Sequence, residues 1–132
     1  MILIFLITMK SGHLAMQSIL SDLNKTSLDI EASAIISADG LVLAAVLPQE
    51  MDEDKIGAIS AAMLSISRRG SQELVNDVME QILIKSTRGY ILITHAGKEA
   101  VLTVITKSHS GLEHTISEIK HSIEKIKALN LF

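Results

Sequence analysis

The side chains best suited to chemistry in this chain are histidines and carboxylates near its end. His114, Glu118 and His121 are spaced by four and three residues, so a helix would place them on one side. Two imidazoles and a carboxylate match the ligand types of a zinc site. This side lies far around the helix from the apolar stripe of the same segment, where a metal would be weakly held. We therefore interpret it as a polar surface and expect no metal site.

Two catalytic patterns are incomplete. Residues 97–98, Gly-Lys, match the end of a phosphate-binding loop, but no glycine lies five residues earlier and Glu99 replaces Ser or Thr. No Gly-x-Ser-x-Gly nucleophile elbow is present, and His13, His95 and His109 lie in different predicted elements. The chain has no Cys, which excludes disulfide and thiolate chemistry. The sequence therefore predicts no catalytic residue, no cofactor and no enzyme activity.

The composition indicates a small apolar domain. The 132 residues fit one domain, and 48% are apolar while only 2% are aromatic, so the core must be aliphatic. Aromatic platforms for single-stranded nucleic acid are missing, and the net charge of −3 leaves no basic footprint. We expect a cytoplasmic protein without a nucleic-acid partner.

Residues 1–9 are strongly apolar but shorter than the ~20 residues that span a bilayer. They also lack the basic region and cleavage site of a signal peptide. Four interpretations stay open: a natural start at Met9, an added edge strand, packing between subunits, or a membrane anchor. We expect no membrane partner, and divide the chain into an apolar extension, residues 1–9, and one domain, residues 10–132.

Apolar periodicity and turn residues predict three helices and five strands. The predicted helices cover residues 10–26, 52–76 and 110–129, and the predicted strands cover 31–37, 41–47, 78–86, 89–95 and 99–106. Asp39-Gly40 favours a type I′ hairpin, which needs positive φ at both central residues. Because the strands are apolar on both faces, helices must cover both sides of the sheet. The predicted fold class is a three-layer α/β/α fold (α+β), with a five-stranded antiparallel sheet in the order α-β-β-α-β-β-β-α.

The central predicted helix, residues 52–76, has three notable features. Asp52 is a plausible N-cap. An apolar stripe and a flank of small residues follow, and Gly57 and Gly70 are predicted to serve close packing because glycine weakens a helix. The stripe consists of Ile56, Ile59, Met63, Ile66, Gly70 and Leu74.

Four segments, in this order and spacing, resemble the roadblock/dynein light chain family over residues 10 to about 128. They are Ser-Ala-Asp-Gly-Leu-Val-Leu-Ala at 37–44, Ile-Gly-Ala-Ile-Ser-Ala-Ala-Met-Leu-Ser at 56–65, Arg-Gly-Tyr-Ile-Leu-Ile-Thr at 88–94 and Ala-Val-Leu-Thr-Val-Ile-Thr at 100–106. Many members open the final helix with Asn-Leu-Gly, where this chain has Ser-Gly-Leu at 110–112. We interpret that as a capping variant with Ser110 as the N-cap.

The resemblance implies that the central helix covers one sheet face and the terminal helices cover the other. It also implies a homodimer that pairs through the third strand and the central helix into a continuous sheet. Prokaryotic members include regulators of Ras-like small GTPases, such as the bacterial gliding-motility regulator, and eukaryotic relatives are scaffold subunits of dynein and of lysosomal complexes. The implied function is a non-enzymatic homodimeric module that binds a Ras-like small GTPase and modulates its nucleotide cycle. The alternatives are a structural scaffold subunit and a PAS-like small-molecule sensor.

Candidate contact residues lie on the central helix and the third strand. The predicted dimer contacts are Gly57, Ala58, Ala61, Ala62, Ser65, Met79, Gln81, Ile82, Leu83 and Ile84. The predicted GTPase contacts are Asp52, Glu53, Arg68, Arg69 and Gln72, and the alternative site is the terminal-helix face around Glu113, Glu118 and Lys125. The two arginines also suit the negative end of a helix dipole without any partner.

Overall fold

A computed structural model describes residues 1–131, apart from the side chains of residues 5 and 8. Residue 132, the last residue of the predicted domain, lies outside the described residues. The helices are α1 (Ile2–Lys25), α2 (Glu53–Gly70) and α3 (Leu112–Ala128), and a short π-helix, η1 (Ser71–Val75), directly follows α2. The strands are β1 (Ile30–Ser37), β2 (Val42–Val46), β3 (Gln81–Lys85), β4 (Tyr90–His95) and β5 (Ala100–Thr106).

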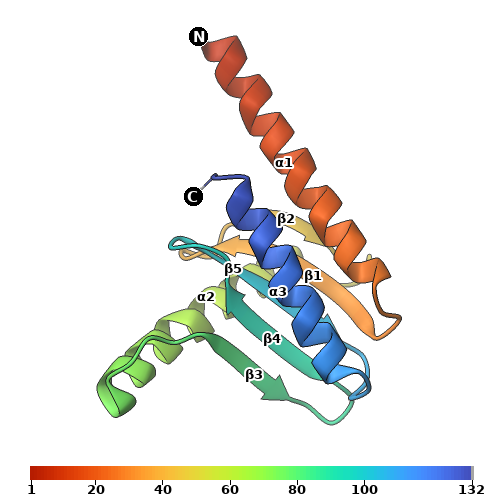
Figure 1. Ribbon diagram of the computed structural model, residues 1–132, viewed down its shortest axis with the longest axis vertical. Helices are drawn as coiled ribbons and strands as arrows, with labels where there is room; N and C mark the ends of the chain where they lie inside the picture. The colour runs from red at the N-terminus through yellow and green to blue at the C-terminus, as the bar shows by residue number, and fades with distance from the viewer. Residues whose placement is uncertain (132) are drawn as a thin grey trace.

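The five strands form one antiparallel sheet in the order β2-β1-β5-β4-β3. β2 and β3 are therefore the two edge strands. Helices α1 and α3 lie side by side on one face of the sheet, and α2 lies on the other (Figure 1). The predicted three-layer fold class and element order are confirmed.

Each sheet face carries its own core. Leu20, Leu92 and Ile119 are fully buried in the core between the sheet, α1 and α3. Leu64 and Ile93 are buried in the core beneath α2, where the Ser60 and Thr103 hydroxyls also share a hydrogen bond of 2.8 Å. Side chains along each strand contribute to the two cores in turn, because adjacent residues of a strand point to opposite faces of the sheet. The central strands are apolar on both faces for this reason.

The first hairpin differs from the predicted type I′ turn. Gly40 has a positive φ of 95°, but Asp39 does not. The Gly40 N–H donates to the Ser37 carbonyl at 3.0 Å, and the Ser37 N–H donates to the Leu41 carbonyl at 2.8 Å. These bonds define a type I turn followed by a left-handed glycine, the common geometry of a longer hairpin loop. Only the glycine therefore needs the left-handed region.

Helix α1 begins at Ile2 rather than at residue 10, so the predicted boundary after residue 9 falls inside a continuous helix. The interpretation of residues 1–9 as an added edge strand is wrong. The second half of α1 packs on the sheet through Met16, Leu20 and Leu23, whereas Leu14 is exposed.

Three element boundaries also differ from prediction. The helix predicted over 52–76 changes to π geometry at Ser71 and stops at Asn76, which adopts a left-handed conformation (φ 54°). The strand predicted from residue 78 begins at Gln81, because residues 76–80 form a connector. The N-cap of α3 is Gly111 in a left-handed conformation without a side-chain bond, so the predicted Ser110 cap is wrong.

Candidate interaction surface on α2 and β3

Helix α2 is capped at its first turn and contacts a turn of its own sheet at its last. The Asp52 carboxylate accepts from the Lys55 N–H at 3.2 Å, which confirms the predicted N-cap. At the other end, Arg68 Nη2 donates to the Lys98 carbonyl in the β4–β5 turn at 3.2 Å. Leu64 is the large α2 side chain buried at the centre of this contact. The orientation of the helix, and thus of its outer face, is therefore set by the chain itself.

The outer face of α2 combines small residues with two large apolar ones. Ala58, Ala62 and Ser65 are exposed, as the predicted dimer contacts require. Ile59 and Ile66, from the predicted apolar stripe, are 53% and 60% exposed. Leu74, from the same predicted stripe, is exposed on η1. Apolar side chains arranged along one helix face without cover are typical of a protein interface.

Gly57 does not belong to this outer face. It is buried, and an added Cβ would lie 2.4 Å from the carbonyl oxygen of Gly40. Ala61, which is half-buried, also lies against Gly40. The prediction that Gly57 serves close packing is confirmed, but its neighbour is the first hairpin of the same chain, which corrects its assignment as a dimer contact. An added Cβ at Gly70 would meet no atom of the described residues within 4 Å, so its predicted packing role finds no neighbour within this chain.

The two edges of the sheet differ in how they are covered. Side chains from α1 donate to or contact the carbonyls of β2: Gln17 Nε2 donates to Ala45 at 2.7 Å, and His13 Nδ1 lies 3.1 Å from the Leu43 carbonyl. Asn24 Nδ2 donates to the Val46 carbonyl at 3.3 Å. Within the described residues, β3 has β4 as its strand neighbour and no strand on its outer side. An uncovered edge invites pairing with another strand.

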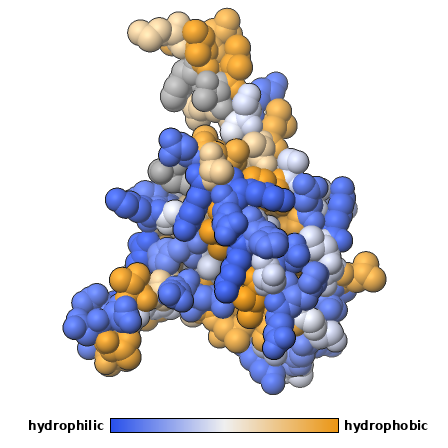
Figure 2. Space-filling view, viewed as in Figure 1, coloured by the Kyte–Doolittle hydropathy of each residue, from blue (hydrophilic) through white to orange (hydrophobic). Residues whose placement is uncertain are grey.

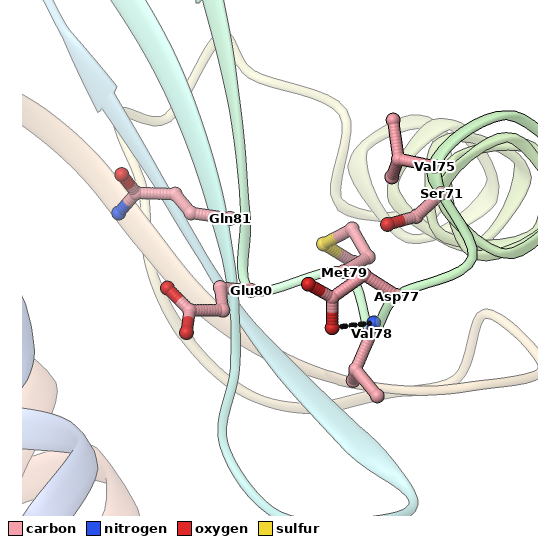
Figure 3. Close-up of a pocket in the computed structure, with 7 residues that line it drawn as sticks. All are labelled: Ser71, Val75, Asp77, Val78, Met79, Glu80 and Gln81. Atoms are coloured by element: carbon pink, nitrogen blue, oxygen red, sulfur yellow. Dashed lines mark hydrogen bonds between the residues drawn. The ribbon is translucent and has the colours of Figure 1, made fainter.

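A hollow of 630 Å³ separates η1 from the start of β3 (Figure 3). It is lined by Ser71, Val75, Asp77, Val78, Met79, Glu80 and Gln81. Val75 and Val78 are 68% and 76% exposed, which adds apolar area next to the β3 edge. Met79 is buried in the core beneath α2, which corrects its assignment as a dimer contact. The remaining predicted strand contacts, Gln81, Ile82, Leu83 and Ile84, lie on β3 itself.

The predicted GTPase contacts do not come together within one chain. Asp52, Glu53, Arg68, Arg69 and Gln72 are all exposed. The acidic pair and the arginines occupy opposite ends of α2, about 24 Å apart along the helix axis. Arg69 forms an exposed ion pair of 3.0 Å with Glu73 one turn later. One chain therefore offers an acidic and a basic contact, separated by the length of the helix.

His95 at the end of β4 lies in a positive environment. Burial lowers the pKa of His95 below its ordinary value of 6.5, and the charges of Arg68 and Lys127 lower it further. Because the folded-state pKa is depressed, the unfolded chain binds the proton first as the pH falls. The stability that neutral His95 contributes is therefore present above about pH 6.5 and is lost as the pH falls through that value toward the folded-state pKa.

We expect His95→Gln to reduce the loss of stability on acidification. Urea denaturation at about pH 7.5 and about pH 5.5 measures this loss for both proteins. An imidazole NMR titration of the unmodified chain checks the cause, and a His95 pKa at or above 6.5 would contradict it.

The histidines do not form a catalytic or metal-binding group. In residues 1–131, no set of three His, Asp or Glu side chains is arranged to hold a metal ion. His114 contacts the Thr26 carbonyl at 3.2 Å, and His109 Nε2 lies 2.7 Å from the Ser86 carbonyl. Tyr90 packs against the core and against the His109 ring, with a centroid distance of 5.0 Å.

Comparison with known proteins identifies the fold. The Roadblock/LC7 domain model matches residues 7–106. The chain is 34% identical over 111 residues to MJ1340, an uncharacterized protein of Methanocaldococcus jannaschii, covering 84% of this chain and 96% of that protein.

Solved structures share the fold at low sequence identity. Myxococcus xanthus MglB superposes with a TM-score of 0.83 at 13% identity, covering 89% of each chain. The gliding protein MglB of Thermus thermophilus superposes with a TM-score of 0.79 at 14% identity, covering 89% of this chain and 90% of that one. With a family model spanning most of the sequence, the chain belongs to the Roadblock/LC7 family.

Proposed function

We propose that this chain is a non-enzymatic homodimeric module that binds a Ras-like small GTPase and modulates its nucleotide cycle. The main support for a dimer is that one edge of the sheet is covered by the chain itself and the other edge is not. Donors from α1 occupy the carbonyls of β2, whereas the outer edge of β3 is uncovered. A second copy that adds its own β3 satisfies that edge and extends the sheet.

The outer face of α2 supports the same arrangement. A two-fold contact uses one patch on both copies, so α2 must be complementary to itself. Ala58 and Ala62 allow two helix backbones to approach closely, and Ile59 and Ile66 supply the apolar area that association buries. The end of α2 and η1 project beyond β3, on the side where a second sheet would lie (Figure 1). The uncovered edge of β3 and the outer face of α2 therefore both favour contact with a second copy of this chain.

The GTPase is supported by family resemblance and by the charges on α2. The chain shares its fold with MglB, a gliding protein. The family resemblance drawn from the sequence includes a gliding-motility regulator of Ras-like GTPases. When two β3 strands pair antiparallel, the two-fold axis is perpendicular to the sheet, and the two α2 helices run in opposite directions. The acidic end of one copy, with Asp52 and Glu53, then approaches the basic end of the other, with Arg68 and Arg69. A GTPase bound across the axis contacts both, and two copies of this chain bind one GTPase.

We expect the unmodified chain to change the rate of nucleotide exchange or hydrolysis by a Ras-like GTPase of the same genome. The double variant Arg68→Glu with Arg69→Glu should weaken binding by about tenfold, because charges on the rim of an interface steer association. The matched control is Lys25→Glu with Lys107→Glu, two exposed cations far from α2. Fluorescence of a labelled nucleotide follows the rate, and light scattering checks that the dimer is retained.

Two outcomes would contradict parts of this proposal. If the chain leaves both rates unchanged and does not bind, the GTPase assignment is wrong. If the arginine variant acts like the unmodified chain, the contact lies elsewhere, and the terminal-helix face around Glu113, Glu118 and Lys125 is the next candidate.

A further inference from the structure

The first turns of α1 extend away from the domain and carry large exposed apolar side chains. Ile2 and Leu3 are 77% and 69% exposed, and Leu6, Ile7 and Met9 are each more than half exposed. They form the apolar projection at the top of Figure 2. The contacts that hold α1 on the sheet come from its later turns, through His13, Gln17 and Asn24. Water alone is an unfavourable environment for such a segment.

The whole of α1 cannot cross a membrane while the domain is folded. By length and composition, Ile2–Lys25 is long and apolar enough to span a bilayer. However, Met16, Leu20 and Leu23 in its second half are buried in the core against α3 and the sheet. The apolar residues 2–9 precede Gly12 and His13, which contact Leu131 and the Leu43 carbonyl, and they measure about 12 Å along the helix axis. That length reaches no further than one leaflet.

The distribution of the side chains around the helix indicates what covers them. At 100° per residue, positions 2, 3, 4, 6, 7 and 9 spread over more than half of the circumference, and all six are exposed apolar residues. A second helix or a protein groove buries one narrow stripe. Lipid chains surround an inserted helix on every side, which suits an apolar surface this broad better than one narrow contact stripe does.

The end of the domain from which this helix emerges carries several lysines, beside the carboxylates of Glu99 and Glu124. Lys98 and Lys127 line a hollow together with Leu131, and Leu131 in turn packs beside Gly12 of α1. Within the described residues neither lysine forms an ion pair, although Glu124 lines the adjoining hollow. Lys10 lies on α1 itself, directly after the apolar segment. These cations would face the headgroups of a membrane that takes up the helix, and anionic lipid attracts them.

We propose that residues 2–9 insert into an anionic lipid bilayer and tether the domain to its surface. The helix enters the membrane obliquely and stays within one leaflet, because residues 2–9 are too short to span the bilayer. Lys10, Lys98 and Lys127 stay at headgroup level. The exposed faces of α2 and β3 do not take part, so the tether is independent of the dimer and of the GTPase.

Vesicle flotation of the full chain tests the tether. Vesicles of equal parts phosphatidylcholine and phosphatidylglycerol should carry the unmodified chain to the top of the gradient, and vesicles of phosphatidylcholine alone should carry less of it. Leu3→Glu with Ile7→Glu should lower the bound fraction by about tenfold or more, since carboxylates are unfavourable in the acyl region. Lys98→Glu with Lys127→Glu should lower binding to anionic vesicles only. Leu28→Glu is the matched control, because Leu28 is 91% exposed beyond the other end of α1.

Three results would overturn the proposal. The first is that the unmodified chain stays at the bottom of the gradient with both vesicle types, and the second is that the Leu3/Ile7 variant floats as well as the control. The third is that this variant changes the molar mass in solution while flotation is unchanged, which would show that the segment packs against a second copy. Circular dichroism of each variant confirms that the domain is folded.

Discussion

Gly57→Ala is expected to lower the free energy of unfolding by about 2–4 kcal/mol, although alanine is the better helix former. The added Cβ would lie 2.4 Å from the Gly40 carbonyl oxygen and 3.1 Å from a methyl group of Val42. The first contact is with backbone, so α2 or the first hairpin must move to relieve it. Such a movement would disturb the core beneath α2, where Leu64 and Ile36 are fully buried. Urea denaturation followed by circular dichroism measures the loss.

The same helix provides the control. Gly70 has no atom within 4 Å of an added Cβ, so Gly70→Ala is expected to leave stability unchanged or raise it by up to about 1 kcal/mol. Opposite signs at the two positions would show that packing, not helix propensity, selects Gly57. Equal effects of the two substitutions would contradict the packing of α2 on the first hairpin.

The second large effect is expected at the outer face of α2. Ile59→Glu combined with Ile66→Glu should weaken self-association by about a hundredfold or more, because two carboxylates would be buried at a contact between like surfaces. Both side chains are more than half exposed in the single chain, so the fold should tolerate the change. Sedimentation velocity at micromolar concentration measures the dimer fraction, and thermal unfolding of the monomer checks the fold.

Leu28→Glu, at an exposed leucine far from α2, controls for a general loss of apolar surface. A monomeric unmodified chain under the same conditions would contradict the dimer. Retention of the dimer by the α2 variant would place the contact elsewhere.

The parts of the fold that the sequence predicts best are those with one strong pattern. The spacing of Ile119, Ile123 and Ile126 predicts the buried stripe of α3, and the structure confirms it. The apolar residues of β1 predict burial on both faces, and Ile35 and Ile36 are fully buried on opposite sides. In these elements each local preference agrees with the tertiary packing.

The pattern in α2 is ambiguous for a physical reason. Ile56, Ile59, Met63 and Ile66 recur at helical spacing, but such spacing marks any apolar face and does not distinguish a core from a contact surface. The contacts of Gly57 and Leu64 with the chain's own sheet turn Ile59 and Ile66 outward. Recognising this from sequence requires knowing where the first hairpin lies relative to the helix, which is tertiary information.

The coverage of the β2 edge was also missed. The polar side of α1 includes His13, Gln17 and Asn24, and from sequence such residues indicate a side of the helix that faces solvent. Their contacts with the Leu43, Ala45 and Val46 carbonyls depend on how α1 lies across the sheet. The family resemblance implies pairing through the third strand, and the structure adds an independent reason because side chains of α1 already occupy the β2 edge.

The most direct test of the proposed function is the molar mass of the complex formed with a Ras-like GTPase. The chain is mixed with the GTPase loaded with GDP or with a non-hydrolysable GTP analogue, and size-exclusion chromatography with light scattering gives the mass. The account predicts a complex of two copies of this chain with one GTPase, formed preferentially in one nucleotide state, because a two-fold axis can be occupied only once. The absence of a complex in either nucleotide state would contradict it.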